Sequence, residues 1–498
     1  HSWRSKAPLV HRATPQWFIS MDSHKLRNKA LKALDETVFY PSKGKDRLKA
    51  MIETRPDWCV SRQRVWGVPL PIFVHKKTKQ ILVDDEVNEN IANIYEEEGS
   101  DCWFSDDPQK FLGDKYKAED YEKLSDIVEV WFDSGSTHSF VLEKRKDLKW
   151  PASMYLEGSD QHRGWFHSSL LESCGTRGKA PFESILSHGF VVDGKGLKMS
   201  KSVGNVIAPE DILKKYGADI LRIWVASSNY AEDLRIDYSI LDQHADSYRK
   251  IRNTFRYLLG NINDNFEEIN LEKIDIKKLP ELEQFMLHKI YSLDLKFRSY
   301  FKNYDFHNLY KEMLNFCTVD LSAFYFDIRK DCLYCDAKDS SKRQSTILLL
   351  KIILNALLKW FAPILSFTTE EIFKLVGNKK SIHLEKFVNF PINFKNDNLN
   401  LKWLELIKIR DICNLSIEEK RSAKIIGSSL EAILKIKLNK KNLEIVKDID
   451  LSELCITSSA QVEKTEQNEV LVETEKAKGN KCSVCWKISI QPCERHGN

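Results

Sequence analysis

The sequence predicts an α/β fold in the first half of the chain, then a helical bundle and a small α+β segment. Two units that join a strand, a glycine-containing turn and a helix indicate the α/β part, at residues 154–174 and 185–212. From about residue 240 the sequence changes to long helices, and residues 282–297 are compatible with an amphipathic face. Alternating apolar and polar residues at 433–438 predict a small sheet after the bundle.

Composition excludes several classes of protein. The chain has 498 residues, 42% hydrophobic and 30% charged, which suits several folded domains and excludes a disordered chain. The net charge is only +4, so any nucleic-acid-binding surface must be local. Only the last three of the eleven cysteines have ligand-like spacing, and no signal-peptide pattern opens the chain. We therefore expect a cytoplasmic protein with a metal site and without a disulfide framework.

One apolar stretch, residues 347–365, has the length of a membrane span. Lys351, Asn355 and Lys359 interrupt it at four-residue steps, which places one polar stripe on an otherwise apolar helix. We therefore expect a buried helix of the bundle and no membrane association.

A lysine-rich loop stands between the second predicted strand and its helix. It consists of Lys198, Met199, Ser200, Lys201 and Ser202. An Asp-Gly turn signal precedes the loop, and a helix start at Pro209 follows it. Lysine charge, together with serine and backbone donors, suits the binding of phosphate groups. Two lysines at this spacing alone favour a basic surface turn, whereas the full pentapeptide in this setting favours phosphate binding.

The first α/β unit carries polar side chains where its strand ends. Glu157, Asp160 and Gln161 follow the apolar residues 154–156. Ligands of open α/β sheets bind at the carboxyl ends of the strands. The alternative is an N-cap cluster in which Asp160 caps a helix that runs through Cys174. Three hydrogen-bonding side chains so close together favour the ligand site.

Two tryptophan-containing segments precede this unit. Residues 127–136 predict a buried strand that runs into a polar loop. Arg62 and Arg64 lie beside Trp58 and Trp66, an arrangement that suits contact with a nucleic-acid strand by charge and stacking. Structural ion pairs and core tryptophans are an equally good interpretation of the same residues.

The end of the chain carries two pairs of candidate metal ligands. They are Cys482 with Cys485, and Cys493 with His496. Two such pairs separated by a short loop suit a four-coordinate structural zinc site. Free reduced thiols are the alternative.

Together these motifs resemble the class I aminoacyl-tRNA synthetases, and among them the bacterial-type isoleucyl enzymes. The resemblance rests on residues 58–71, 130–139, 156–166 and 198–202 and on the terminal cysteine pairs. It implies the second half of a doubly wound catalytic domain, an anticodon-binding bundle and a zinc knuckle. It also implies a reaction that joins isoleucine to ATP as an adenylate and then transfers the acyl group to tRNA(Ile).

The resemblance implies roles for the ATP-binding residues. Lys201, assisted by Lys198, would stabilise the departing pyrophosphate, because preorganised charge lowers the barrier to displacement at a phosphate. Gly158 and Asp160 would meet the ATP ribose, and Gly189 would let the adenine approach the backbone. The rest of the lysine loop would also contact ATP, a substrate that is accompanied by Mg²⁺.

Four further residues would bind the amino-acid part of the adenylate. By the same resemblance, Glu157 would bind the aminoacyl-adenylate and Gln161 would meet the substrate ammonium. Trp131 and Trp165 would form the walls of the aliphatic pocket. Gln161 stands four residues before Trp165, so on one helix the two side chains would project to the same face.

The sequence departs from the family in two respects. It contains neither a His-x-Gly-His element, the other part of the ATP site, nor the threonine-rich editing sequence. Since residue 1 is not Met, we expect the C-terminal half of a longer enzyme. A valyl or leucyl enzyme and a noncatalytic tRNA-binding relative are the alternatives. The family usually ends its second ligand pair in Cys, so a ligand beyond Asn498 is an alternative to His496.

The expected organisation is a monomer of five parts with tRNA(Ile) as its partner. They are the remainder of an insertion (connective-peptide) region at 1–150, the second half of a Rossmann-like catalytic domain at 151–240, an anticodon-binding bundle at 241–400, an α+β junction segment at 401–475 and a zinc knuckle at 476–498.

Overall fold

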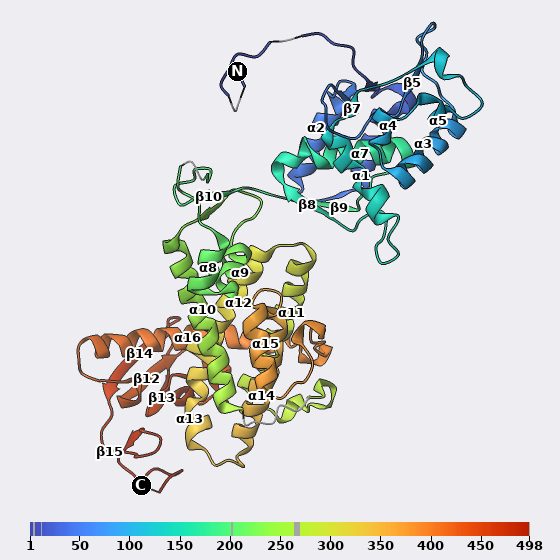
Figure 1. The fold of residues 1–498 in the computed structure, drawn as a ribbon. Coiled ribbons are helices and arrows are strands. Elements are labelled where there is room, and N and C mark those ends of the chain that lie inside the picture. The colour runs from blue at the N-terminus through green and yellow to red at the C-terminus, as the bar shows by residue number, and fades with distance from the viewer. Residues whose placement is uncertain (3–4, 11, 201–202, 263–268, 498) are drawn as a thin grey trace. The chain divides into compact units, whose positions relative to one another are not determined.

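The computed structural model comprises two compact units (Figure 1). It describes residues 1–498 except 3–4, 11, 201–202, 263–268 and 498. Unit 1 is formed by His1–Val191 and Tyr230–Leu234, and unit 2 by Val192–Asn229 and Arg235–Asn498.

The division between the units falls at Val191, whereas the sequence indicated a change near residue 240. The cause is α9 (Ala218–Ser227), which is bonded to the helical bundle of unit 2. Its Arg222 donates to the carbonyl oxygen of Pro363 at 2.6 Å. Its buried Asp219 accepts a bond from the Thr368 hydroxyl, also at 2.6 Å.

A three-stranded parallel sheet forms the centre of unit 1. Its strands, in spatial order, are β2 (Val38–Tyr40), β9 (Ser184–His188) and β8 (Tyr155–Gly158). Gly158 pairs with His188, so the carboxyl ends of β8 and β9 are level. The central strand β9 is buried along its length up to half-buried His188, as is usual for parallel sheets.

Two helices share a core with this sheet, α1 (Leu26–Glu36) and α7 (Trp165–Arg177). Phe166 of α7 and Ile185 of β9 are fully buried in that core. The helix α7 ends at Gly178, whose φ of +75° is the left-handed conformation that glycine adopts most readily after a helix.

The segment 127–136 does not form the predicted strand. Only β7 (Ile127–Val128) is extended, and α6 (Val130–Gly135) is helical, so Trp131 lies on a helix. The apolar run is short, and periodicity cannot distinguish a short buried strand from a buried helical turn.

Residues 73–123 form a subdomain of unit 1 with its own core. Phe73, Trp103 and Phe111 are buried there, and the ring of Trp103 lies 5.1 Å from each of the other two rings. Its elements are β5 (Phe73–His75), α3 (Asp85–Glu98), α4 (Cys102–Ser105), α5 (Pro108–Leu112), η2 (Ala118–Asp120) and β6 (Tyr121–Lys123). The other elements of unit 1 are β1 (Phe18–Ile19), η1 (Ser23–Lys25), α2 (Lys43–Glu53), β3 (Trp58–Cys59), β4 (Ser61–Arg62), η3 (His138–Leu142) and η4 (Ser159–His162).

Unit 2 is built on a helical bundle, as predicted. Its main helices are α10 (Tyr238–Asn261), α11 (Glu281–Lys302), α12 (Phe306–Asn315), the π-helix η7 (Phe316–Phe326), α13 (Asp327–Cys335), α14 (Ser341–Phe361), α15 (Ser366–Leu375) and α16 (Asp397–Ser422). Leu282, Phe285, Met286 and Phe297 of α11 are buried, which confirms the apolar face of residues 282–297. The short elements of unit 2 are α8 (Pro209–Tyr216), η5 (Leu271–Lys273), η6 (Ile276–Lys278), η8 (Ile382–Leu384) and η9 (Ile392–Phe394).

The helix α14 is long and apolar enough, by length and composition, to cross a membrane. In the structure 61% of its most apolar window is buried. Leu350, Leu354 and Leu357 are among its fully buried residues. A core helix of a bundle has these properties, and α14 was expected to be one.

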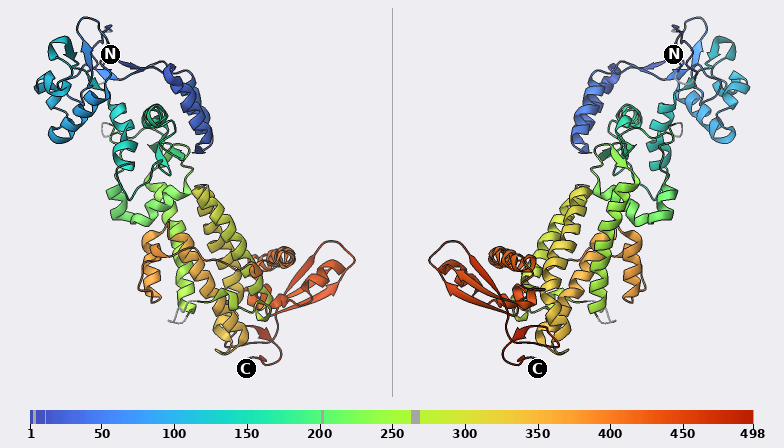
Figure 2. Two further views of the ribbon diagram at one scale, coloured as in Figure 1. Left: turned by 90° about the vertical axis from the view of Figure 1, so that its right-hand side faces the viewer. Right: turned by 90° about the vertical axis from the view of Figure 1, so that its left-hand side faces the viewer.

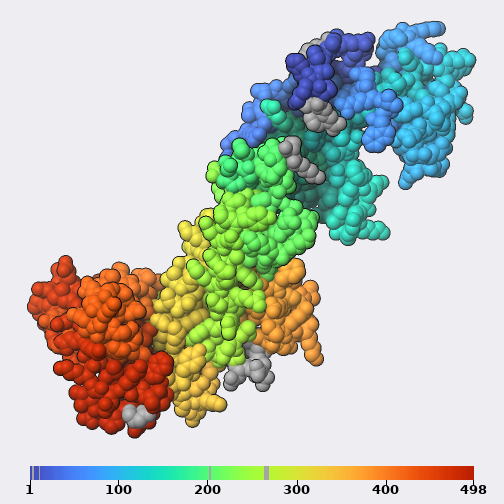
Figure 3. All heavy atoms as spheres, turned by 60° about the vertical axis from the view of Figure 1, so that its left-hand side comes forward, coloured from blue at the N-terminus to red at the C-terminus, as the bar shows by residue number. Residues whose placement is uncertain are grey.

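The predicted small sheet follows the bundle (Figure 2). β12 (Ala432–Leu438) lies between β13 (Ser459–Lys464), to which it is parallel, and β14 (Leu471–Lys476), to which it is antiparallel. Arg410 of α16 joins this segment to the bundle by donating to the carbonyl oxygen of Leu454 at 2.9 Å. In Figure 3 the C-terminal residues, in red, adjoin the orange and yellow helices of the same unit. The remaining elements are β10 (Val191–Asp193), β11 (Leu234–Ile236), η10 (Ser429–Glu431), α17 (Lys440–Val446), α18 (Leu451–Leu454), β15 (Asn480–Lys481) and β16 (Ile488–Ser489).

Candidate functional site

Polar groups gather where β8 ends. Glu157 is exposed, and its Oε2 accepts a bond from the amide of Gly158 at 3.1 Å. A Cβ on Gly158 would lie 2.8 Å from Oδ1 of Asp160, so the Asp160 carboxylate packs closely against the Gly158 backbone. Glu157, Gly158 and Asp160 therefore form one polar edge at the carboxyl end of the strand, where ligands of open sheets bind.

Gln161 and Trp165 do not share a helix, contrary to the expectation from their spacing. Gln161 lies in η4, Trp165 begins α7, and Gly164 (φ −109°, ψ −115°) interrupts the chain between them. Oε1 of Gln161 accepts the Trp165 amide at 3.1 Å, and its Nε2 donates to Asp160 at 3.1 Å. Gln161, and not Asp160, therefore satisfies the first amide of α7. Oε1 of Gln161 is the atom that could accept a bond from the substrate ammonium. In the structure this oxygen already accepts a bond from the backbone amide of Trp165.

The two candidate wall tryptophans are held differently. Trp165 stacks on Tyr155 of β8, with ring centroids 4.0 Å apart and an interplanar angle of 1°. Its indole N–H donates to the carbonyl oxygen of Ser134 at 2.9 Å. Trp131 rests against Gly164, where a Cβ would lie 2.8 Å from the ring, and is 39% exposed. Trp165 is fixed in place, whereas Trp131 offers an open face. Sequence reasoning missed Tyr155, although it stands only two residues before Glu157.

Gly189 lies directly after β9 and makes room for another segment of unit 1. A Cβ at this position would lie 2.2 Å from the carbonyl oxygen of Glu232, and the Gly189 amide donates to the carbonyl oxygen of Tyr230 at 2.9 Å. This close approach by itself requires glycine. The single strand predicted over residues 185–192 is also divided here, into β9 and β10.

Asn205 braces the described part of the lysine loop. Its Oδ1 accepts the amide of Ser200 at 2.9 Å, and its Nδ2 donates to Oδ2 of Asp193 at 2.9 Å. Asp193 also accepts the amide of Leu197 at 2.8 Å. The bond from Asn205, followed by the backbone bond, lowers the pKa of Asp193, so the brace keeps an ionised carboxylate. Sequence reasoning missed this brace.

The residues of the lysine loop differ in exposure. Lys198 is exposed, whereas Met199 and Ser200 are half-buried. Lys201 and Ser202 lie outside the described residues. Residues 198–200 belong to unit 2, whereas Gly158, Asp160 and Gly189 belong to unit 1.

The structure separates the two pairs of arginine and tryptophan in residues 58–66. Glu129 accepts bonds from the buried Trp58 indole at 2.5 Å and from Arg62 at 2.8 Å, so this pair is structural. Arg64 is exposed and Trp66 is 91% exposed, so the second pair is accessible to a partner.

A cavity of about 300 Å³ adjoins Trp131. Arg55 and Arg163 line it together with His167. Burial lowers the pKa of Arg55. Burial, and to a smaller extent the charge of Arg55, lowers the pKa of His167 to about 3, so this histidine is neutral. Three arginines (Arg55, Arg62 and Arg163) and two carboxylates (Asp57 and Glu129) line this cavity, so it carries charges of both signs.

The terminal candidate ligands converge in unit 2. Single ligand atoms of Cys482, Cys485, Cys493 and His496 all lie within 4.8 Å of one another. The Cys485 and Cys493 sulfurs are 3.8 Å apart, and Nδ1 of His496 lies 3.5 Å from the Cys482 sulfur. Hydrogen bonds to the sulfur, chiefly from the Cys485 amide, lower the pKa of Cys482 to about 6. Three sulfurs and one imidazole nitrogen in such proximity fit a tetrahedral zinc ion.

The bundle orients the histidine of this cluster. His496 donates from Nε2 to the carbonyl oxygen of Cys335 at 3.1 Å, which leaves Nδ1 facing the sulfurs. The pKa of His496 is raised by several hydrogen bonds, and the bond to the Cys335 carbonyl has the largest effect. Arg495 forms ion pairs with Asp331 at 2.7 Å and Asp336 at 2.9 Å. Ligating histidines are commonly held by such a carbonyl, so His496 fits the ligand role without a residue beyond Asn498.

Two family models match the chain. The model of the class I tRNA synthetases (I, L, M and V) matches residues 6–237. The model of the anticodon-binding domain of tRNA ligases matches residues 283–438. The second match lies within unit 2 and covers the bundle from α11 to α16, together with β12.

Similar curated proteins carry the name isoleucine–tRNA ligase. The Pelagibacter ubique protein is 77% identical over the whole chain, which covers 55% of that protein. The Mesorhizobium japonicum protein is 45% identical over 98% of the chain, or 51% of its own length. The chain thus spans about half the length of the curated relatives it matches.

Solved structures agree at the level of the fold. Mycobacterium tuberculosis methionyl-tRNA synthetase bound to methionyl-adenylate matches 75% of this chain and 65% of its own, with a TM-score of 0.53 and 15% sequence identity. The fold is therefore that of a class I synthetase catalytic domain with an anticodon-binding domain. These matches show that the chain belongs to the class I tRNA synthetases, in the isoleucine–tRNA ligase family.

Proposed function

We propose that this chain is the part of an isoleucine–tRNA ligase that carries half of the adenylate-forming site and the tRNA-binding bundle. The observation that carries the proposal is the 77% identity to an isoleucine–tRNA ligase along the whole chain. The gathering of Glu157, Asp160, Gln161 and Trp165 at the end of β8 supports it. The whole protein activates isoleucine with ATP and then acylates tRNA(Ile).

One group of site residues binds the nucleotide, and another group binds the amino acid. Lys201 and Lys198 neutralise the pyrophosphate of ATP·Mg²⁺ as it departs, and the Asn205 brace shapes their loop. Gly158 and Asp160 meet the ribose, and the adenine approaches the backbone near Gly189, at the carboxyl end of β9. No covalent nucleophile is needed for this displacement.

The amino acid lies between the strand end and the tryptophans. Glu157 holds the adenylate, and Gln161, whose oxygen accepts the Trp165 amide and keeps a second lone pair, lies with Asp160 near the substrate ammonium. Trp165 forms the rigid wall and Trp131 the open wall of the aliphatic pocket.

The bundle and the segment that follows it bind tRNA. The match of residues 283–438 to anticodon-binding domains of tRNA ligases supports this assignment. The modest overall charge of +4 places the contact on local basic groups. We propose that the catalytic remainder includes β2, which pairs with β9, in addition to the expected residues 151–240, and that the knuckle lies at 476–498. We also propose a monomeric cytoplasmic enzyme.

The zinc knuckle consists of Cys482, Cys485, Cys493 and His496, and when zinc is bound it fixes the end of the chain. We expect one zinc per chain by elemental analysis of purified protein. Cys482→Ser should abolish zinc retention, and His496→Ala should reduce it, because each removes a ligand. Cys335→Ser is the matched control, since this cysteine adjoins the knuckle but is not among the four ligands. Protein without metal, or equal zinc in Cys482→Ser, would contradict the site.

The proposed activity is tested by ATP–pyrophosphate exchange with isoleucine, valine, leucine and methionine. A full-length protein that contains this chain should prefer isoleucine to valine by about 10- to 200-fold, the selectivity that one methylene supplies in an apolar pocket. Trp165→Ala should raise the KM for isoleucine and narrow that ratio, because it removes the fixed wall. Trp66→Ala, a change in an exposed loop, should leave the ratio unchanged. A preference for valine or leucine would contradict the proposed substrate.

A further inference from the structure

Tyr155 of β8 contacts the helix α7 at two points. Its ring stacks on that of Trp165, with centroids 4.0 Å apart and an interplanar angle of 1°. Its hydroxyl lies 3.0 Å from Oγ of Ser169, which stands four residues after Trp165 and therefore on the same face of α7. Tyr155 and Ser169 are both buried. Tyr155 thus ties the start of α7, and the ring of Trp165 with it, to the strand β8.

The strand places this stack beside the polar edge of the candidate site. Tyr155 and Glu157 stand two residues apart on β8, so their side chains project from the same face of the sheet. β8 pairs with β9 without interruption from Tyr155 to Gly158, so this alternation holds up to the end of the strand. The Trp165 ring is therefore supported by the strand that also carries Glu157, the residue proposed to hold the adenylate.

A hydrogen bond holds one edge of the Trp165 ring. The indole N–H donates to the carbonyl oxygen of Ser134 at 2.9 Å. Ser134 belongs to α6, the helix that carries Trp131. A single hydrogen bond fixes the place of the N–H group but tolerates rotation of the ring about the bond, whereas a stacked aromatic partner fixes the plane of the ring. Tyr155 therefore supplies the restraint that the hydrogen bond does not.

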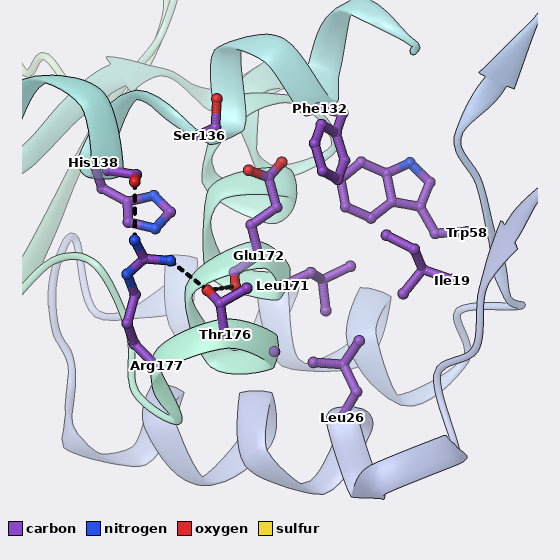
Figure 4. Close-up of a pocket in the computed structure, with 12 residues that line it drawn as sticks. Ile19, Leu26, Trp58, Phe132, Ser136, His138, Leu171, Glu172, Thr176 and Arg177 are labelled. Carbon is purple, nitrogen blue, oxygen red and sulfur yellow. Dashed lines mark hydrogen bonds between the residues drawn. The ribbon is translucent and has the colours of Figure 1, made fainter. Parts of the chain in front are cut away.

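The packing between α6 and α7 leaves unfilled space near this turn. Gly135 of α6 lies against Glu172 of α7, because a Cβ on Gly135 would collide with Oε1 of Glu172. Next to this contact is a cavity of about 340 Å³, whose lining includes Phe132, Ser136 and Leu171 (Figure 4). Figure 4 shows the carboxyl group of Glu172 pointing into the space between Phe132 and Ser136. Since close packing is what resists the displacement of side chains, this void increases the importance of the direct contacts of Tyr155 and Ser134.

We propose that Tyr155 is a positioning residue for amino-acid selection, because its ring sets the plane of the Trp165 indole and so the width of the pocket that accepts isoleucine. This inference rests on the proposed function, in which Trp165 is the fixed wall of that pocket. Isoleucine and valine differ by one methylene, so an apolar pocket separates them only if its wall is held at the right distance. Tyr155 is itself buried and acts on the substrate only through Trp165.

The test is ATP–pyrophosphate exchange by the full-length enzyme with isoleucine and with valine. Tyr155→Leu removes the stacked ring and keeps an apolar side chain. It should raise the KM for isoleucine and narrow the isoleucine-to-valine ratio by about 2- to 10-fold, the range that one aromatic pair contributes. The kcat and the KM for ATP should stay close to the parental values, because neither depends on the wall of the side-chain pocket. Folded Tyr155→Leu with the parental ratio would overturn the proposal.

The conservative replacement separates the ring of Tyr155 from its hydroxyl. Tyr155→Phe keeps the stack on Trp165 and loses only the contact with Ser169. It should therefore retain the parental isoleucine-to-valine ratio, even if the loss of a buried hydrogen bond lowers the melting temperature. A ratio that falls as far in Tyr155→Phe as in Tyr155→Leu would contradict the role of the ring.

A double-mutant cycle tests whether Tyr155 acts through Trp165. In the Trp165→Ala background, Tyr155→Leu should change the isoleucine-to-valine ratio by less than about 2-fold, because the ring that it positions is already absent. An equal effect of Tyr155→Leu in the parent and in Trp165→Ala would overturn the proposal.

Tyr121→Leu is the matched control, since Tyr121 packs on the rings of His75 and Tyr116 in the separate core of the 73–123 subdomain. It should leave the ratio at the parental value, and circular dichroism confirms that each variant is folded. The parent enzyme distinguishes the two levels of the argument. A parent without isoleucine-dependent exchange would contradict the proposed function itself, whereas a selective parent with an unaffected Tyr155→Leu variant would contradict only the role of Tyr155.

Discussion

Replacing Lys201 with alanine in the full-length enzyme should slow isoleucyl-adenylate formation by about 100-fold or more, the scale of losing one preorganised transition-state contact. The charge on the departing pyrophosphate grows during the reaction, and we propose that this lysine, in the loop that the family resemblance identifies, stabilises it. The measurement is isoleucine-dependent ATP–pyrophosphate exchange at saturating ATP. The effect should fall on kcat more than on the KM for isoleucine, because the proposed role of this lysine is toward the nucleotide and not toward the amino acid.

Two further replacements in the same loop make this result specific. Lys195→Ala is the matched control, since Lys195 is exposed and its amide, not its side chain, bonds to Asp193. Asn205→Ala should cause a smaller loss than Lys201→Ala, because it removes the brace of the loop but keeps both lysines. Equal activities of Lys201→Ala and Lys195→Ala would remove Lys201 from the catalytic assignment.

Glu283→Ala should lower the free energy of unfolding of unit 2 by about 3–5 kcal/mol, the cost of breaking a buried ion pair from one side. Glu283 is fully buried and bonds to Arg329 at 2.6 and 2.7 Å. It also accepts bonds from Tyr325 at 3.0 Å and Thr346 at 3.2 Å. Without Glu283, the buried guanidinium of Arg329 retains Glu453 of α18 as its one charged partner among the described residues.

Urea unfolding, followed by the fluorescence of the bundle tryptophans, measures this loss. Glu418→Ala is the control, since its pair with Arg421 is exposed and should contribute less than about 1 kcal/mol. The double variant Glu283→Leu/Arg329→Met should lose less than Glu283→Ala, because neither charge then remains buried alone. A loss below about 1 kcal/mol for Glu283→Ala would show that Arg329 finds another partner.

Turn residues, helix starts and ligand spacing in the sequence correctly predicted the elements whose formation depends on neighbouring residues. The Asp-Gly turn and Pro209 delimit the lysine loop, and α8 begins at Pro209 as expected. The bundle, the small sheet and the convergence of the terminal cysteine pairs also follow from periodicity and spacing.

Features that depend on contacts between distant residues could not be predicted. The Gln161 amide oxygen bonds the start of α7 because Gly164 breaks the helix, and spacing alone cannot reveal such a break. Trp58 and Arg62 are structural because Glu129 lies between them in space, 67 residues after Arg62 in sequence. No motif marks the buried, unpartnered side-chain atoms of Glu172 and His138, since each is an isolated residue in the sequence.

The pairing of β2 with β9 has a consequence during synthesis of the chain. Val38 pairs with Ser184, 146 positions later, so β2 leaves the ribosome long before its only partner in the described sheet exists. At about 5–20 residues per second, that interval is about 7–30 s. Throughout it, Phe39, which is 7% exposed in the folded unit, lacks the cover that β9 provides. The nascent segment around β2 is therefore where a chaperone that recognises apolar extended chain would bind.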